Sequence, residues 1–189
     1  MTTNDIINST RVAHVRELKN EVAHLKEELT RTRAELDAVR THFALALEAA
    51  RDADLLPEGG ALLIVDGWNA LLGSASLLTA EEKHATPSVK AACLEAVVTD
   101  WLAAHPRDRA GIVFDGAHAG GHVAARLRVT YTGGTGAHRA DRFVCDYLRM
   151  RRFSGAAFPV RVVTEDKDFR GDVQSLGVEV VPVSFLRQP

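Results

Sequence analysis

The sequence predicts a protein of the α/β class, in which a parallel sheet with helices on both faces follows one long N-terminal helix. Apolar runs of strand length alternate with segments of helical period in the later part of the chain. From Arg11 to Arg51 there is neither Gly nor Pro, and apolar residues recur every three or four positions. The chain has 189 residues, of which 46% are hydrophobic and 25% charged, so it has room for one domain and an accessory segment.

The N-terminal helix is expected to form a parallel, two-stranded coiled coil. Its apolar series is a heptad seam with a positions at Val15, Val22, Leu29, Leu36 and Phe43, and d positions at Leu18, Leu25, Thr32, Val39 and Ala46. Early β-branched residues at a with Leu at d favour two parallel strands. The flanking charges agree, because each g glutamate would face a basic e residue of a second copy: Glu21 with Lys26, Glu28 with Arg33, and Glu35 with Arg40.

Two other uses of this helix remain open. It could lie as a single amphipathic helix on its own domain, or its seam could recruit a different chain, such as a subunit of a larger complex. The regular charges on both flanks favour the homodimer over a helix that docks on its own domain.

Pro57 and Gly59-Gly60 separate the helix from the α/β part of the chain. We therefore assign residues 1–52 to the coiled coil, 53–60 to a linker and 61–189 to the domain. The expected strands of that domain are Ala61–Asp66, Gly111–Asp115, Leu127–Thr132, Pro159–Thr164 and Val178–Val183. Its expected helices are Pro87–Ala104, Ala137–Arg152 and Asp168–Leu176.

Acidic residues follow three of the expected strands. Asp66 ends the first strand, Asp115 ends the second, and Asp166 comes just after the fourth. Asp141 lies near the start of the helix after the third strand. Ligands of a parallel sheet gather outside the carboxyl ends of its strands, so these acids are expected to converge.

Crowded carboxylates repel one another and stay ionised only beside a cation. Hard oxygen ligands suit Mg²⁺ or Mn²⁺, which bind substrate phosphates and support attack of water on a phosphodiester. The alternative for each acid is a structural role as a helix cap.

The motifs Asp66-Gly67-Trp68-Asn69, Phe114-Asp115, Ala140-Asp141 and Thr164-Glu165-Asp166 resemble, in this order, those of the NYN domains of the PIN-like ribonuclease superfamily, and most of all its YacP-like branch. The resemblance spans about residues 62–186. It implies a PIN-like three-layer α/β/α sandwich and a metal-dependent endoribonuclease that leaves 5′-phosphate and 3′-hydroxyl ends. It also implies a catalytic set of Asp66, Asp115, Asp141 and Asp166, with Asn69 as an auxiliary ligand. Trp68 stands where that family more often has Tyr.

A local basic patch is needed for RNA, because the chain as a whole carries a formal charge of −2. Arginines crowd the helix that carries Asp141, and we expect four of them to contact the RNA backbone: Arg139, Arg142, Arg149 and Arg152. Trp68, next to the acids, could stack on a base or form an apolar cover over the sheet.

Two rival functions follow from the same residues. One is a catalytically weak nucleic-acid-binding or scaffolding module held together by the coiled coil, and the other is a small-molecule phosphohydrolase. The complete acidic set favours the nuclease. Cys93 and Cys145 are too few for a disulfide framework, and neither a signal peptide nor a membrane span is evident, so a cytoplasmic protein is expected.

Overall fold

The computed structural model describes residues 3–73, 77–134 and 136–188. It divides into two compact units, residues 1–43 and residues 44–189. One helix, α1 (Thr3–Leu55), supplies the first unit and the beginning of the second.

The first unit is helical, and its apolar stripe is uncovered. The predicted seam residues from Val15 to Phe43 that are large and apolar have exposed fractions between 45% and 66%. Such a stripe is stable in water only when another surface covers it. Among the described residues of this unit, none covers the stripe, and the predicted coiled-coil seam is exposed from Val15 to Phe43.

The last turns of α1 belong to the α/β unit. Leu45 and Ala49 are buried in its core, and Asp52 is 2% exposed. The Asp52 carboxylate accepts a hydrogen bond from Tyr147 Oη at 2.7 Å and pairs with Arg128 Nη2 at 2.7 Å. The change in packing therefore falls at Ala44, before the expected linker of residues 53–60.

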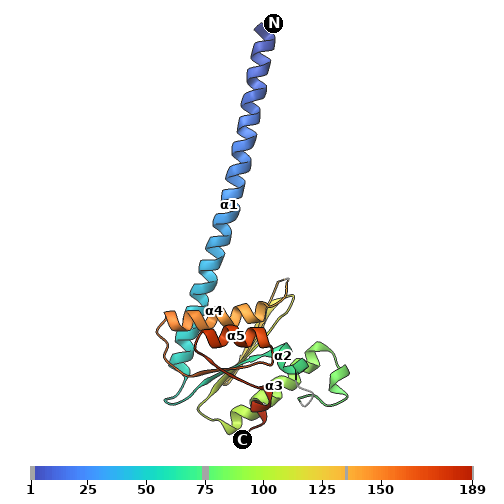
Figure 1. The fold of residues 1–189 in the computed structure, drawn as a ribbon, viewed down its shortest axis with the longest axis vertical. Helices are drawn as coiled ribbons and strands as arrows, with labels where there is room; N and C mark the ends of the chain where they lie inside the picture. The colour runs from blue at the N-terminus through green and yellow to red at the C-terminus, as the bar shows by residue number, and fades with distance from the viewer. Residues whose placement is uncertain (1–2, 74–76, 135, 189) are drawn as a thin grey trace. The chain divides into compact units, whose positions relative to one another are not determined.

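A six-stranded sheet runs through the second unit in the order β3-β4-β2-β1-β5-β6 (Figure 1). The strands are β1 (Leu62–Asp66), β2 (Arg109–Phe114), β3 (Ala119–Ala124), β4 (Leu127–Thr132), β5 (Val160–Val163) and β6 (Glu179–Val181). All neighbours pair in parallel except β3, which runs antiparallel to β4 at the edge. This edge strand was not predicted, because its sequence AGGHVA has no apolar alternation and all its residues are exposed.

Helices cover both faces of the sheet, as Figure 1 shows. They are α2 (Gly67–Gly73), α3 (Pro87–Ala104), α4 (Arg139–Phe153) and α5 (Lys167–Ser175), with short 3₁₀ segments at Glu82–His84 and Val183–Arg187. The predicted fold class is confirmed: the second unit is a three-layer α/β/α sandwich with a mostly parallel sheet, consistent with a PIN-like fold, and a long helix precedes it.

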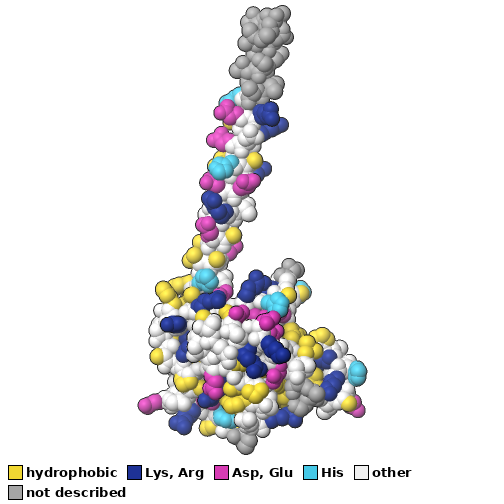
Figure 2. All heavy atoms as spheres, viewed as in Figure 1, with side chains coloured by type: hydrophobic (Ala, Val, Ile, Leu, Met, Phe, Trp, Pro, Cys, Tyr) yellow, Lys and Arg dark blue, Asp and Glu magenta, His cyan; other side chains and the backbone are white. Residues whose placement is uncertain are grey.

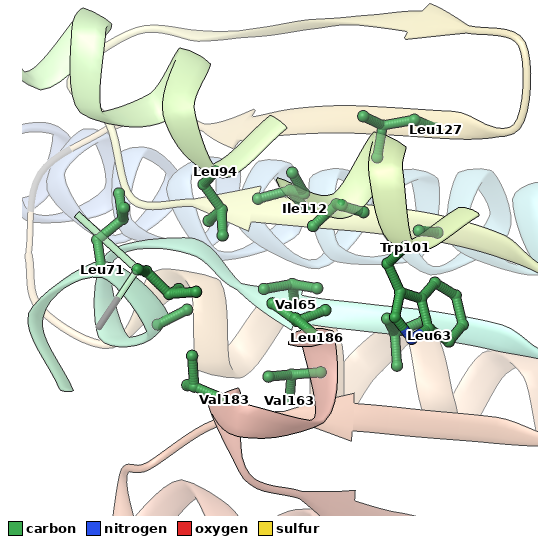
Figure 3. Close-up of a cluster of buried hydrophobic side chains, with 14 of the residues drawn as sticks. Leu63, Val65, Leu71, Leu94, Trp101, Ile112, Leu127, Val163, Val183 and Leu186 are labelled. Carbon is green, nitrogen blue, oxygen red and sulfur yellow. The ribbon is translucent and has the colours of Figure 1, made fainter. Parts of the chain in front are cut away.

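The central strand β1 explains why both faces need a cover. Its residues alternate between the two faces, and all five are buried. Leu63 and Val65 join one core with α2, α3 and the C-terminal 3₁₀ segment, part of which is drawn in Figure 3. Leu62 and Ile64 join a second core with α4, α5 and the end of α1.

Among the described helices, none is both long and apolar enough to cross a bilayer.

Candidate active site

The strand order reverses between β1 and β5, and open parallel sheets have their ligand crevice at such a reversal. From β1 the chain first builds the sheet toward β2 and β4, and then crosses to the other side of β1 to form β5 and β6. Ligands of open α/β sheets bind at such a reversal, outside the carboxyl ends of the strands. Asp66 ends β1, and Thr164, Glu165 and Asp166 follow β5, so both segments lie at this crevice.

Asp66 is a buried acid in an unfavourable electrostatic environment. Its side chain is 7% exposed, and Thr164 Oγ1 donates a hydrogen bond to its Oδ2 at 3.1 Å. Burial raises the pKa of Asp66 to about 7, and the charges of Asp141 and Asp166 add to this, against hydrogen bonds from Thr164 and the Asn69 backbone. At neutral pH the ionised form is therefore costly without a cation.

Asp141 lies in the first turn of α4 and faces the same acids. Its pKa is raised chiefly by burial and further by the charges of Asp166 and Asp115, while His138 lowers it. The His138 Nδ1 atom lies 3.0 Å from Asp141 Oδ2, so this histidine supports the carboxylate. The four predicted acids thus share one electrostatic site.

Asp115 and Asp166 also serve as helix caps. Asp115 Oδ1 accepts hydrogen bonds from Ala140 N at 2.8 Å and Thr132 Oγ1 at 3.3 Å, which fixes the start of α4. Asp166 Oδ1 accepts from the amides of Asp168 at 2.8 Å and Phe169 at 3.1 Å, at the start of α5. All these bonds use Oδ1. The capping role and a ligand role for Oδ2 are therefore compatible in both residues.

Asn69 and Thr164 connect the end of β1, the helix α2 and the loop after β5 by hydrogen bonds. Asn69 Oδ1 accepts a hydrogen bond from Glu165 N at 2.8 Å, so its amide oxygen holds the loop after β5 against α2. It also lies 3.3 Å from Thr164 Oγ1, whose single proton is shared between Asn69 and Asp66. Thr164 is fully buried, and its hydroxyl also accepts from Asp166 N at 3.1 Å. Sequence analysis did not assign Thr164 a role, although its place directly after a buried strand and before Asp166 is a signal for one.

The donor set fits a hard divalent cation that keeps part of its water shell. Carboxylate oxygens are suitable ligands, and the mutual repulsion of Asp66, Asp141 and Asp166 is what such a cation would relieve. Within the described residues, no three His, Cys, Asp or Glu side chains form a group that could hold a metal ion by themselves. Mg²⁺ commonly binds through one or two carboxylates plus waters and substrate phosphates, so the arrangement fits Mg²⁺ better than a fully coordinated structural ion.

The predicted RNA-binding arginines have different surroundings. Arg139 is largely buried and donates to the carbonyls of Gly116, at 2.9 Å, and Gly133, so it holds two loops together. Arg142, beside the acids, donates hydrogen bonds to the carbonyls of His138 and Ala137. Arg149 and Arg152 lie about 12 and 17 Å further along α4 than Asp141, at about 1.5 Å per residue. Arg149 pairs with Asp146 at 2.7 Å, and Arg152 is exposed.

Trp68 is fixed beside the acids. Its indole Nε1 donates a hydrogen bond to the Asp115 carbonyl at 2.7 Å, and its ring packs on Phe114 with centroids 4.8 Å apart. Figure 2 shows acidic side chains gathered where α4 and α5 begin, next to a hydrophobic surface over α2.

Comparisons with known proteins give a similarity of structure alone. No family profile matches the sequence, and no curated protein matches it. Among solved structures, the chain is similar to the crystal structure of Rae1 (YacP) from Bacillus subtilis, with 19% identity and a TM-score of 0.48 over 67% of this chain and 71% of that one. A tryptophan-to-leucine mutant of the same protein gives 18% identity and a TM-score of 0.47 over 67% and 72%.

Proposed function

We propose that this chain is a metal-dependent endoribonuclease that hydrolyses RNA phosphodiester bonds. One observation carries the proposal: a buried Asp66, with its pKa near 7, lies at the sheet crevice together with the like charges of Asp141 and Asp166. A protein keeps such an arrangement at a cost in stability, and strongly perturbed carboxyls in a crevice are typical of functional sites. The order of the acids along the chain, which resembles that of NYN domains, supports the choice of RNA.

Each residue has a role in this mechanism. Asp66, Asp141 and Asp166 would hold Mg²⁺ or Mn²⁺ together with waters and the RNA phosphate, because among the described residues the carboxylates do not form a metal-binding group by themselves. Asp115 would complete the ligand set or orient a water. When bound, the cation supplies a water of lowered pKa and offsets the charge that develops on the phosphate. Thr164 positions Asp66 and Asp166, His138 supports Asp141, and Asn69 holds the loop that carries Thr164.

The arginines of α4 would bind phosphates of the RNA backbone along a path that ends at the acids. Arg142 lies beside the site, and Arg149 and Arg152 extend the path along the helix. Arg139 would act by holding the loops of Gly116 and Gly133, in addition to any contact with phosphate. The two free cysteines support a cytoplasmic setting for the enzyme.

An RNA cleavage assay tests the proposal. Wild type should cleave single-stranded or structured RNA with Mg²⁺ or Mn²⁺ and lose this activity in EDTA. Asp66→Asn should lower the rate by orders of magnitude, because it removes one charged ligand while keeping the volume of the side chain. Asp172→Asn, the same change at an exposed acid of α5, is the matched control and should cleave as wild type does.

Each rival function has its own outcome in this assay. Binding of RNA without cleavage at any metal concentration would favour the nucleic-acid-binding module. Turnover of nucleotides without polymer cleavage would favour the small-molecule phosphohydrolase. Equal cleavage by wild type and Asp66→Asn would place the activity outside this site and overturn the proposal.

The first unit would make the enzyme a parallel homodimer. Its support is the exposed seam from Val15 to Phe43 together with the complementary g and e charges. Light scattering of the full chain at micromolar concentration should give the mass of a dimer. Leu25→Glu with Leu29→Glu places charges in the seam and should give a monomer, whereas a monomeric wild type would contradict the coiled coil.

A further inference from the structure

A groove lies directly beside the acids, between α2 and the start of α3. It has a volume of about 540 Å³, which is in the range of roughly 300–1,000 Å³ that is typical of ligand pockets. Its lining is apolar with a basic rim and includes Trp68, Leu71, Leu72, Leu78, Lys83 and Lys90. Among the described residues, no acidic side chain lines this groove, whereas the neighbouring site at Asp66 is acidic.

The apolar wall of this groove is open to solvent at one residue. Leu72 is 80% exposed, although Leu71 and Leu78, next to it in the lining, are buried in the core. Trp68 is half-buried, and its ring is held by the bond to the Asp115 carbonyl and by Phe114. A ring fixed in this way can stack on a planar ligand with little loss of conformational entropy.

The two lysines of the rim have no acidic partner. Among the described residues, neither Lys83 nor Lys90 lies within 4.0 Å of a carboxylate oxygen. The neighbouring Glu82 is engaged elsewhere, since its carboxylate accepts hydrogen bonds from Thr79 N at 2.7 Å and Cys93 Sγ at 3.3 Å. Two unpaired cations beside an apolar wall complement a ligand that combines anionic groups with flat apolar rings.

We propose that this groove binds one or two unpaired nucleotides of a single-stranded RNA next to the cleaved phosphate, with a base on Trp68 and Leu72 and phosphates at Lys83 and Lys90. Single strands are bound in this way in general, by stacking platforms next to a basic path for the backbone. The proposal rests on the proposed function for the choice of RNA, and it names a subsite on the opposite side of the acids from the arginines of α4.

Binding in EDTA separates this subsite from catalysis. Fluorescence anisotropy with a labelled twelve-nucleotide oligoadenylate gives the Kd, because no cleavage occurs without metal. Leu72→Glu should weaken binding about tenfold, the scale of one lost stacking contact. Val123→Glu is the matched control, since Val123 is 63% exposed on the edge strand β3 and pairs with Arg128 near the start of β4, away from the acids, and it should bind as wild type does.

Two further readouts identify the chemistry of the contact. Lys83→Glu with Lys90→Glu should reduce the slope of log Kd against log salt by about 1.4, or about 0.7 for each phosphate contact. Lys83→Arg with Lys90→Arg keeps both charges and should keep the slope of wild type. The oligonucleotide should also quench the tryptophan fluorescence of wild type but not of Trp68→Phe, because Trp101, the other tryptophan, is buried.

The outcomes distinguish the two proposals. Cleavage by wild type combined with unchanged binding by the Leu72 and lysine variants would overturn the subsite and leave the nuclease intact. Weakened binding by these variants in a protein that never cleaves RNA would support the subsite and reject the nuclease. Absence of any RNA binding by wild type would overturn the subsite as well.

Discussion

Two aspartates are buried in the described part of the molecule, and their surroundings are opposite. Asp52, at the end of α1, faces Arg128 and the Tyr147 hydroxyl, whose pKa is raised by burial and by Asp52, so that Tyr147 stays a donor. Asp66, at the end of β1, faces the carboxylates of Asp141 and Asp166. Burial alone therefore does not distinguish a structural acid from a functional one, whereas the charge of its neighbours does.

The Asp52 cluster joins elements that are far apart in the sequence, since it links α1 to β4 and α4. The Asp66 cluster joins the ends of β1 and β5 and the start of α4 at a cost in the ionised state that a cation can offset. The first cluster stabilises the α/β unit as it stands, and the second prepares it for a ligand. Substitutions at the two sites should accordingly shift stability in opposite directions.

The largest effect on stability is expected at Asp52. Asp52→Ala leaves the Tyr147 hydroxyl without its acceptor and leaves Arg128 with only its pair to Glu48 at 3.3 Å. It should lower the free energy of unfolding by about 3 kcal/mol, the lower end for a broken buried pair, because Arg128 keeps Glu48 and some contact with water. Chemical denaturation at pH 7 measures it. Cleavage by the folded fraction should be unchanged, and a loss below about 0.5 kcal/mol would remove the structural role of Asp52.

Asp66→Asn should have the opposite sign, and only at higher pH. The pKa of Asp66 is raised in the folded protein from 3.8 to about 7, so the folded state holds the proton longer than the unfolded state does. Stability of the metal-free protein should therefore fall as the pH rises from about 4 to 7. Asp66→Asn removes this loss, which corresponds to roughly 4 kcal/mol for the shift of pKa, but its amide has one acceptor oxygen where the carboxylate accepts from Thr164 and the Asn69 backbone. The net gain over wild type should therefore be about 2 kcal/mol at pH 8.

At pH 4 this advantage of Asp66→Asn should vanish, because Asp66 is then protonated in the folded wild type. Denaturation curves in EDTA at the two pH values provide the comparison. An Asp66→Asn variant that is less stable than wild type at pH 8 would mean that the carboxylate is satisfied without a cation.

A smaller effect is expected at Thr164, which connects Asp66 with Asp166. Thr164→Val keeps the shape of the side chain but removes the hydrogen bond to Asp66 Oδ2 and the acceptor for Asp166 N. We expect a loss of about 1–2 kcal/mol at pH 8 and a further rise in the pKa of Asp66. Thr99→Val, at an exposed position of α3, is the control and should change stability by less than about 0.5 kcal/mol.

Most of the α/β unit could be predicted because its signals are local and periodic. The buried strand β1 is apolar at four of its five positions, and α3 has the predicted bounds, Pro87–Ala104. The apolar stripe expected on α3 was wrong in part, since Val89 is 46% exposed and the buried face is formed by Ala91, Leu94, Val98, Trp101 and Leu102. Convergence of the acids followed from a general property of parallel sheets. The edge strand β3 was not predicted, because Gly120 and Gly121 interrupt any apolar pattern in its sequence.

The remaining features depend on contacts between segments that are distant in the sequence. The predicted heptad seam ends at Ala46, and the residues of α1 that the α/β unit buries, Leu45 and Ala49, lie outside its a and d positions. The position of Arg139 at the start of an arginine-rich helix suggests a surface cation, but its guanidinium donates hydrogen bonds to two loop carbonyls. Nothing in the period of a helix indicates which tertiary surface will meet a given side chain.

The difference between the two buried aspartates can be measured directly by carboxyl NMR titration. In metal-free wild type, the Asp66 resonance, assigned by its loss in Asp66→Asn, should titrate with a pKa near 7. Saturating Mg²⁺ should lower that pKa by at least two units, because the cation favours the ionised carboxylate. A pKa near 4 without metal, or one near 7 that Mg²⁺ does not change, would contradict a cation site at this edge of the sheet.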